Sequence, residues 1–121
     1  MSSGTRLRCL DPASGLVLAR RVEAAHSLPR RIKGLLGRRE LAPDQGLWLR
    51  PCRQVHTWFM RFPIDVLFLD RELVVVGLVR NLGPWRLSPF YFRARSALEL
   101  AAGRARDLAP GQRLVFERIA A

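Results

Sequence analysis

The chain has 121 residues, which is the length of one domain and leaves little room for a second. Hydrophobic residues make up 49% of it, enough for a core without disulfides or metals, yet no apolar run approaches the ~18 residues of a membrane helix. The N-terminal residues lack the apolar stretch of a signal peptide. We therefore expect one cytoplasmic domain over residues 1–121 without a membrane span, whose formal charge of +11 favours acidic partners.

The first third of the chain predicts a hairpin followed by a helix. Residues 5–10 alternate between apolar and basic, residues 16–22 are mainly apolar, and the Asp-Pro-Ala-Ser-Gly segment between them is typical of a turn. Leu28, Ile32, Leu35 and Leu36 then follow the spacing of a short amphipathic helix that ends near Gly37.

The rest of the chain predicts mainly short strands. They are expected at residues 46–49, 55–60, 64–69, 73–79, 96–100 and 114–119. Residues 81–92 resemble an irregular loop, 101–108 a short helix, and 109–112 a type II turn. In residues 55–60, alternation places His56, Trp58 and Met60 together on one face of the strand.

These elements predict the class α+β, predominantly β. About seven or eight short strands and one or two short helices are expected. Their regular spacing favours a small barrel or a strongly curved antiparallel or mixed sheet.

Several stretches together resemble a known family. They are RRIKGLLGRREL at 30–41, VHTWFMRFPIDVLFLD at 55–70, ALELAAG at 97–103 and LAPGQRLVF at 108–116. In this order and at these distances they resemble the uncharacterised bacterial and archaeal family named domain of unknown function 192, over about residues 16–116. The resemblance implies a compact, mainly β domain and implies no activity.

The first functional hypothesis is a non-enzymatic binding or accessory domain. Arg38, His56 and Trp58 supply a cation, a titratable ring and a stacking surface, which suit a small anionic or aromatic ligand. We expect any pocket to include at least two of them, and His56 to make binding depend on pH. The alternative is that Trp58 and Met60 belong to the core while Arg38 is solvated.

The second hypothesis is a small hydrolase or a thiol-dependent enzyme. Cys52 and His56 are four residues apart and are candidates for a nucleophile and its base. Asp65 and Glu99, which are also candidates for the ligand site of the first hypothesis, would serve as an acid–base pair if they faced one cavity. Otherwise Asp65 is a buried structural carboxylate bonded to backbone donors or to an arginine, and Glu99 is exposed.

The third hypothesis is weak, non-specific nucleic-acid binding that fades as salt rises. It rests on a dense basic patch within residues 30–39: Arg30, Arg31, Lys33, Arg38 and Arg39. No reading motif accompanies the patch. The cysteines and histidines match no familiar zinc spacing, so we predict neither a metal nor a cofactor.

Overall fold

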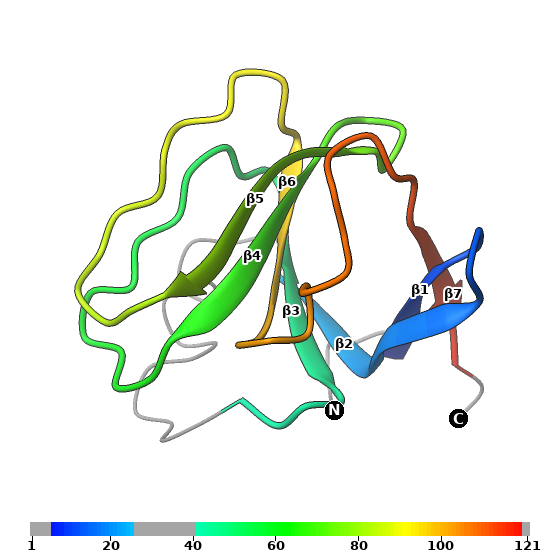
Figure 1. Cartoon of the computed structure of the whole chain (residues 1–121), viewed down its shortest axis with the longest axis horizontal. Coiled ribbons are helices and arrows are strands. Elements are labelled where there is room, and N and C mark those ends of the chain that lie inside the picture. The colour runs from blue at the N-terminus through cyan, green and yellow to red at the C-terminus, as the bar shows by residue number, and fades with distance from the viewer. Residues whose placement is uncertain (1–5, 26–40, 120–121) are drawn as a thin grey trace.

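The computed structural model describes residues 6–25 and 41–119, whose strands form one mixed sheet (Figure 1). The helix predicted from Leu28 to Gly37 and the basic patch at 30–39 lie outside the described residues. Within the described part there are seven strands: β1 (Arg6–Asp11), β2 (Leu16–Ala25), β3 (Gln45–Leu49), β4 (Ile64–Leu69), β5 (Val75–Leu82), β6 (Ser96–Ala101) and β7 (Val115–Arg118).

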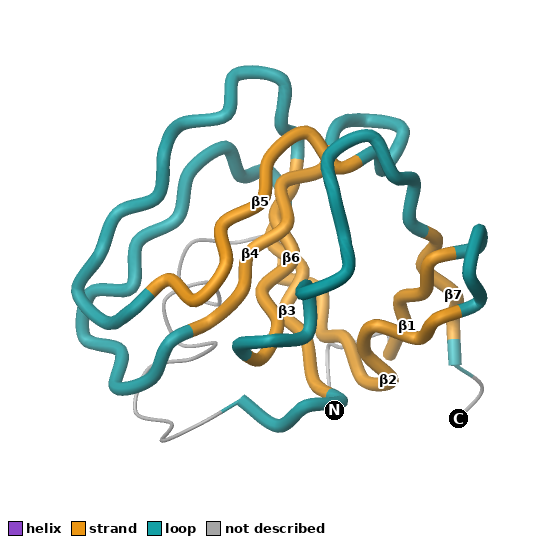
Figure 2. Tube along the Cα trace, in the orientation of Figure 1, coloured by secondary structure: helices purple, strands orange, loops and turns teal. Residues whose placement is uncertain are grey.

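The sheet is strongly curved and mixed, as predicted, but it does not close into a barrel. Its order is β5-β4-β6-β3-β2-β1-β7, in which β2 and β3 pair in parallel and every other neighbouring pair is antiparallel. Curvature brings the chain before β5 near the chain before β7, where the single bridge Val74–Arg113 forms. Figure 2 shows that the strands β5 and β7 themselves lie apart.

Strand β4 is buried on both faces, and all six of its residues are inaccessible to solvent. Ile64, Val66 and Phe68 belong to one apolar cluster, and Leu67 and Leu69 belong to the other. The first cluster is covered by residues of the loops that precede β4 and β6. The second is covered by the β1–β2 hairpin and by the segment between β6 and β7.

No helix is present among the described residues, so the helix predicted at 101–108 is wrong. The segment forms successive turns, in which the N–H of Arg104 donates to the carbonyl of Ala101 and that of Leu108 to Ala105. The reason lies elsewhere in the chain. The carboxylate of Asp65 accepts the N–H groups of Gly103 and Ala105 at 3.0 and 2.9 Å, which fixes these donors outside a helical pattern.

The turn predicted at 109–112 is confirmed. Gly111 has a φ of 98°, which a residue in the third position of a type II turn requires. The N–H of Gln112 donates to the carbonyl of Ala109 at 3.3 Å and closes the turn. The turn lies just before the bridge Val74–Arg113, which joins the chain before β7 to the chain before β5.

Asp65 is the buried structural carboxylate that the sequence predicted, with 1% of its surface exposed. Its third partner is the N–H of Asn81 at 2.8 Å, so these three partners are all backbone donors. Asn81 lies at an irregularity of the β4–β5 pairing and has a φ of 54°. The carboxylate therefore stabilises both this bulge and the turns after β6.

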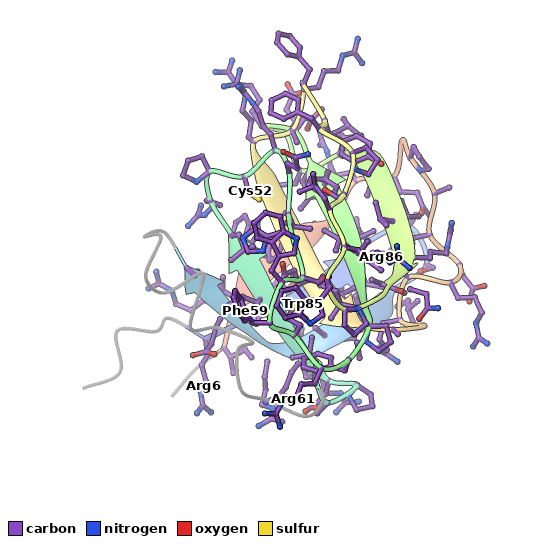
Figure 3. All side chains as sticks on the ribbon, turned by 90° about the vertical axis from the view of Figure 1, so that its left-hand side faces the viewer. Arg6, Cys52, Phe59, Arg61, Trp85 and Arg86 are labelled. Atoms are coloured by element: carbon purple, nitrogen blue, oxygen red, sulfur yellow. The ribbon has the colours of Figure 1, made fainter. Side chains whose placement is uncertain are left out.

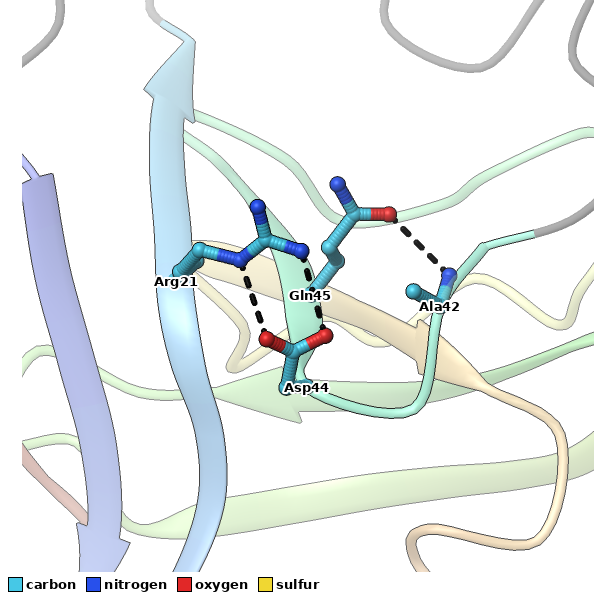
Figure 4. Close-up of polar contacts among 4 residues, drawn as sticks. All are labelled: Arg21, Ala42, Asp44 and Gln45. Atoms are coloured by element: carbon cyan, nitrogen blue, oxygen red, sulfur yellow. Dashed lines mark hydrogen bonds and ion pairs between the residues drawn. The ribbon is translucent and has the colours of Figure 1, made fainter.

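A surface ion pair and neighbouring backbone bonds lie where the pairing of the parallel strands β2 and β3 begins (Figure 4). Arg21 donates to both carboxylate oxygens of Asp44, at 3.0 and 3.2 Å, and this bond holds the pKa of Asp44 below its usual range. The carbonyl of Asp44 also accepts the N–H groups of Arg20 and Arg21. Because the pair is exposed, its backbone bonds matter more for the fold than its charge.

We predict that Asp65→Ala lowers the free energy of unfolding by about 2–4 kcal/mol, because it leaves three backbone donors, among them the buried N–H of Ala105, without their acceptor. Urea melts of the variant and wild type measure this difference. Asp107→Ala, which removes an exposed carboxylate nearby, is the control and should change stability little. Equal midpoints for Asp65→Ala and wild type would contradict the assignment.

A second prediction concerns alkaline stability. Burial raises the pKa of the Cys9 thiol from 9.0 to about 12. Below pH 9 the thiol is protonated in both states. Between pH 9 and 12 the unfolded chain loses this proton while the folded chain keeps it, so stability falls. At pH 10 the loss due to Cys9 is about 1 kcal/mol. Urea melts at pH 8 and pH 10 should show that the free energy of unfolding falls further in wild type than in Cys9→Ala. Equal falls in the two proteins would contradict the prediction.

Candidate functional site

Large exposed apolar side chains are concentrated on two loops. The first loop (residues 51–63) joins β3 to β4, and the second (residues 83–95) joins β5 to β6. Of the exposed large hydrophobic residues described, all but Leu16 lie there: Trp58, Phe59, Trp85, Leu87, Phe90 and Phe92. We call these segments the aromatic loops. An exposed apolar patch of this kind is typical of a binding surface.

The aromatic loops run side by side and are joined along their length by backbone hydrogen bonds (Figures 1 and 2). The N–H of Tyr91 donates to Arg53 at 2.8 Å, and that of Ser88 donates to Val55 at 2.9 Å. The Ser88 hydroxyl in turn accepts the N–H of Val55 at 3.0 Å. These bonds fix the relative position of the two loops although neither is a regular strand.

Thr57 makes most of the bonds at one end of this ladder, and it is fully buried. Its N–H donates to the carbonyl of Arg86 at 2.8 Å, and its carbonyl accepts the N–H of Trp85 at 2.9 Å. Its hydroxyl accepts the N–H of Arg86 at 2.8 Å and donates to the carbonyl of Gly83. Three polar groups of one residue thus position the segment that carries Trp85.

The predicted strand at 55–60 is wrong, and the reason is a turn. Of these residues only His56 makes a β-bridge, to Leu87. The N–H of Met60 donates to the carbonyl of Thr57, and Phe59 adopts a φ of 69°. Phe59 therefore leaves the face predicted for it and becomes exposed, while Met60 turns into the core.

Backbone strain coincides with the exposed rings. Trp85, like Phe59, adopts a left-handed conformation, with a φ of 60°. Bulky residues rarely adopt this conformation, and it costs of order 1 kcal/mol or more. Such strain persists where surrounding bonds impose it, and it is concentrated at functional sites.

Two ring pairs, His56 with Trp58 and Phe59 with Trp85, lie at this end of the loops, and we call them together the Trp58–Trp85 cluster. The ring centroids of His56 and Trp58 are 4.6 Å apart, and those of Phe59 and Trp85 are 4.7 Å apart. Figure 3 shows Phe59 and Trp85 beside each other, at the end of the loops near Arg61. Trp58 is 47% exposed and Trp85 is 59% exposed, so their rings remain accessible.

A second exposed group lies at the other end of the ladder, where Phe90 and Phe92 flank Tyr91. The ring of Tyr91 packs against Phe68, with centroids 4.5 Å apart, and covers Gly77 so closely that a side chain there would overlap it. This contact anchors the second loop to the sheet. Phe90 and Phe92 consequently face solvent, with exposures of 57% and 77%.

The aromatic loops carry only positive charge. They contain no aspartate or glutamate and five arginines: Arg53, Arg61, Arg86, Arg93 and Arg95. An open hollow of about 350 Å³ between the loops is lined by Arg53 and Arg95 together with Pro51, Cys52 and Ala94. Arg53 donates to the carbonyl of Ala94 at 3.1 Å, and its guanidinium lies 5.8 Å from the ring of Phe92.

The structure brings His56 and Trp58 together, which are two of the five residues predicted for the ligand site. His56 and Trp58 are both exposed and in ring contact, so the alternative that Trp58 belongs to the core is wrong. Met60 does belong to the core, as that alternative held. Arg38 lies outside the described residues.

The members of each residue pair predicted for catalysis differ in burial or in the face of the sheet that they occupy. Cys52 is buried and its thiol donates to the carbonyl of Gln54 at 3.3 Å, whereas His56 is exposed. In the β4–β6 register Asp65 is opposite Leu100 and Glu99 is opposite Val66. Because direct partners share a face and successive residues alternate, Asp65 and Glu99 lie on opposite faces of the sheet. Glu99 is also buried rather than exposed.

Two further observations apply to the described residues alone. They contain no cluster of three or more His, Cys, Asp or Glu side chains suited to a metal ion. None of them forms a helix with the length and apolar character needed to cross a bilayer.

Sequence reasoning missed Phe59, Trp85, Phe92 and Thr57 as site residues. The available signal was composition: residues 83–95 hold four aromatic residues and three arginines without an acidic one. Thr57 gave no signal of its own, because its role depends on partners almost thirty residues away in the chain.

The geometry defines a mainly β domain with an exposed aromatic and cationic loop surface. The chain belongs to the family domain of unknown function 192, "Uncharacterized ACR", whose model matches residues 11–116. The family resemblance seen in the sequence is therefore confirmed.

Two solved structures share the fold. A "putative transcription regulator" from Sinorhizobium meliloti 1021 is 30% identical, covers 96% of this chain and 97% of its own, and has a TM-score of 0.74. A protein of unknown function from Novosphingobium aromaticivorans DSM 12444 is 23% identical over 91% of this chain and 83% of its own, with a TM-score of 0.76. No curated protein matches the sequence significantly.

We predict that Thr57→Val destabilises the protein by about 2 kcal/mol, because it leaves the N–H of Arg86 and the carbonyl of Gly83 without their hydroxyl partner. In NMR spectra, the indole N–H signal of Trp85 should show that its ring becomes mobile. Thr57→Ser keeps the hydroxyl and should retain most of the stability and the wild-type Trp85 signal. If Val and Ser variants behaved alike, the hydroxyl would not be what holds the loops.

Proposed function

We propose that this protein is a non-enzymatic binding domain whose ligand surface is the Trp58–Trp85 cluster with its neighbouring arginines. The ligand class is a molecule that joins a planar ring to a negative charge, of which a nucleotide is the simplest example. The observation that carries the proposal is the gathering of exposed rings and arginines on two hydrogen-bonded loops without one acidic residue.

The physical basis is stacking combined with charge pairing. Trp58 and Trp85 offer exposed aromatic surface, and a base stacked on an aromatic side chain contributes about 1–3 kcal/mol. Arg86 is exposed next to Trp85 and is a donor for a phosphate group. Because the surface is open rather than enclosed, we expect a single nucleotide to bind with a Kd of about 1 mM.

Binding is favoured over catalysis by the positions of the titratable groups. The thiol of Cys52 is buried and Asp65 is occupied by three backbone donors. The cluster itself contributes His56, whose ring packs on Trp58, and no acidic partner for it lies on the aromatic loops. We retain the cytoplasm as the proposed compartment. The Sinorhizobium meliloti protein, named as a regulator of transcription, is compatible with a ligand of this class.

The test uses the three tryptophans as built-in reporters. The indole N–H signals in NMR spectra are assigned with single Trp→Phe variants. They are then followed while thymidine monophosphate is added. We expect saturable shifts of Trp58 and Trp85 but not of Trp48, which is 7% exposed on the opposite side of the sheet. Absence of saturable shifts at roughly ten times the expected Kd would overturn the proposal.

Matched variants separate stacking from charge. Trp85→Ala should weaken binding about tenfold, since it removes one stacking surface. Arg86→Ala should weaken the monophosphate but not thymidine, because only the former carries the negative charge. Leu16→Ala and Arg106→Ala, which alter an exposed apolar and an exposed basic residue outside the aromatic loops, are the controls.

A further inference from the structure

The aromatic loops carry two exposed ring groups, and a single nucleotide accounts for only one of them. The Trp58–Trp85 cluster lies at the Thr57 end of the ladder, whereas Phe92 lies next to Arg53. Thr57 and Arg53 are four positions apart along the first loop, which corresponds to roughly 13 Å of extended chain. Bases stack about 3.4 Å apart along a strand, so this distance fits about three or four nucleotides.

The end of the ladder beside Phe92 is suited to phosphates. The hollow lined by Arg53 and Arg95 lies along the same ladder, because the N–H of Cys52 donates to Arg95 and that of Tyr91 donates to Arg53. The Nε–H of Arg53 donates to the carbonyl of Ala94, and the guanidinium of Arg53 lies 5.8 Å from the centroid of the Phe92 ring. A cation beside an exposed ring matches the combination of phosphate and base in a nucleotide.

We infer that the ligand of this surface is single-stranded nucleic acid, which runs along the aromatic loops from the Trp58–Trp85 cluster to Phe92 and the arginine-lined hollow beside it. The inference rests on the proposed function and extends it from one nucleotide to a chain. Stacking platforms combined with a positive track are the means by which proteins bind single strands without reading their sequence.

An anionic membrane is the competing partner, and the arrangement of the rings argues against it. A membrane anchor buries one contiguous apolar tip and keeps its cations at the rim. Here the rings are divided into two groups at opposite ends of the ladder, Arg86 separates Trp85 from Leu87 in the sequence, and Arg53 lies beside Phe92. Burying both groups in a bilayer would also bury the arginines next to them, which is costly.

Chain length and salt provide the first measurements. Affinities for thymidine monophosphate, a tetranucleotide and an octanucleotide of thymidine are compared by fluorescence anisotropy and by the tryptophan shifts. We expect a gain of at least about tenfold from monophosphate to tetranucleotide and a smaller gain beyond it. Three or four phosphate contacts predict a slope of log Kobs against log salt of about −2 to −3.

The far-end variant Phe92→Ala is decisive, because its side chain is 77% exposed and its removal does not disturb the core. It should weaken the octanucleotide about fivefold or more while leaving the monophosphate unchanged. Leu16→Ala should change neither. If the monophosphate binds but neither chain length nor Phe92→Ala matters, the inference fails and the proposed function stands.

Two other outcomes are also decisive. If neither monophosphate nor oligonucleotide shifts the tryptophan signals, the proposed function fails together with the inference. If the octanucleotide does not bind but phosphatidylcholine–phosphatidylglycerol vesicles do, and Phe92→Ala abolishes vesicle binding, the surface is a membrane anchor and the inference is overturned. Vesicles of phosphatidylcholine alone are the control for charge.

Discussion

Burial of β4 on both faces is the constraint from which the rest of the structure follows. Each of its residues is inaccessible, yet the described residues contain no helix that covers the sheet. Loops and turns must therefore exclude water from it. A loop in that position brings its own backbone polar groups out of water, and each of those groups then needs a hydrogen-bond partner. The hydrogen-bonded ladder of the aromatic loops and the cradle around Asp65 both satisfy this requirement.

The same constraint explains why aromatic side chains are exposed. In the aromatic loops the inward positions are taken by core residues such as Val55, Met60 and Ala94. A turn closed by Thr57 and the left-handed conformations of Phe59 and Trp85 direct other large rings outward. Neither the exposure nor the strain stabilises the fold. Both are consistent with selection for contact with a ligand.

The sequence predicted the strands well and the loops poorly, for one physical reason. Apolar runs such as Ile64–Leu69 and the hairpin pattern around residues 11–15 depend on local periodicity, which survives in the fold. Residues 55–60 alternate just as clearly, but the bonds of Thr57 to Gly83, Trp85 and Arg86 convert them into a turn. The segment 101–108 is likewise held by Asp65. Partners distant in sequence decided both cases, and periodicity carries no information about them.

Rigidity of the loops connects stability to recognition. An exposed ring on a mobile loop must be ordered when a ligand binds, and that entropy cost reduces affinity. Here the ladder from Cys52 to Thr57 fixes the rings during folding, before any ligand is present. The buried hydroxyl of Thr57 touches no ligand in this scheme, yet it determines where Trp85 lies. Affinity at the surface therefore depends on hydrogen bonds beneath it, and residues that hold the loops together act as positioning residues for binding.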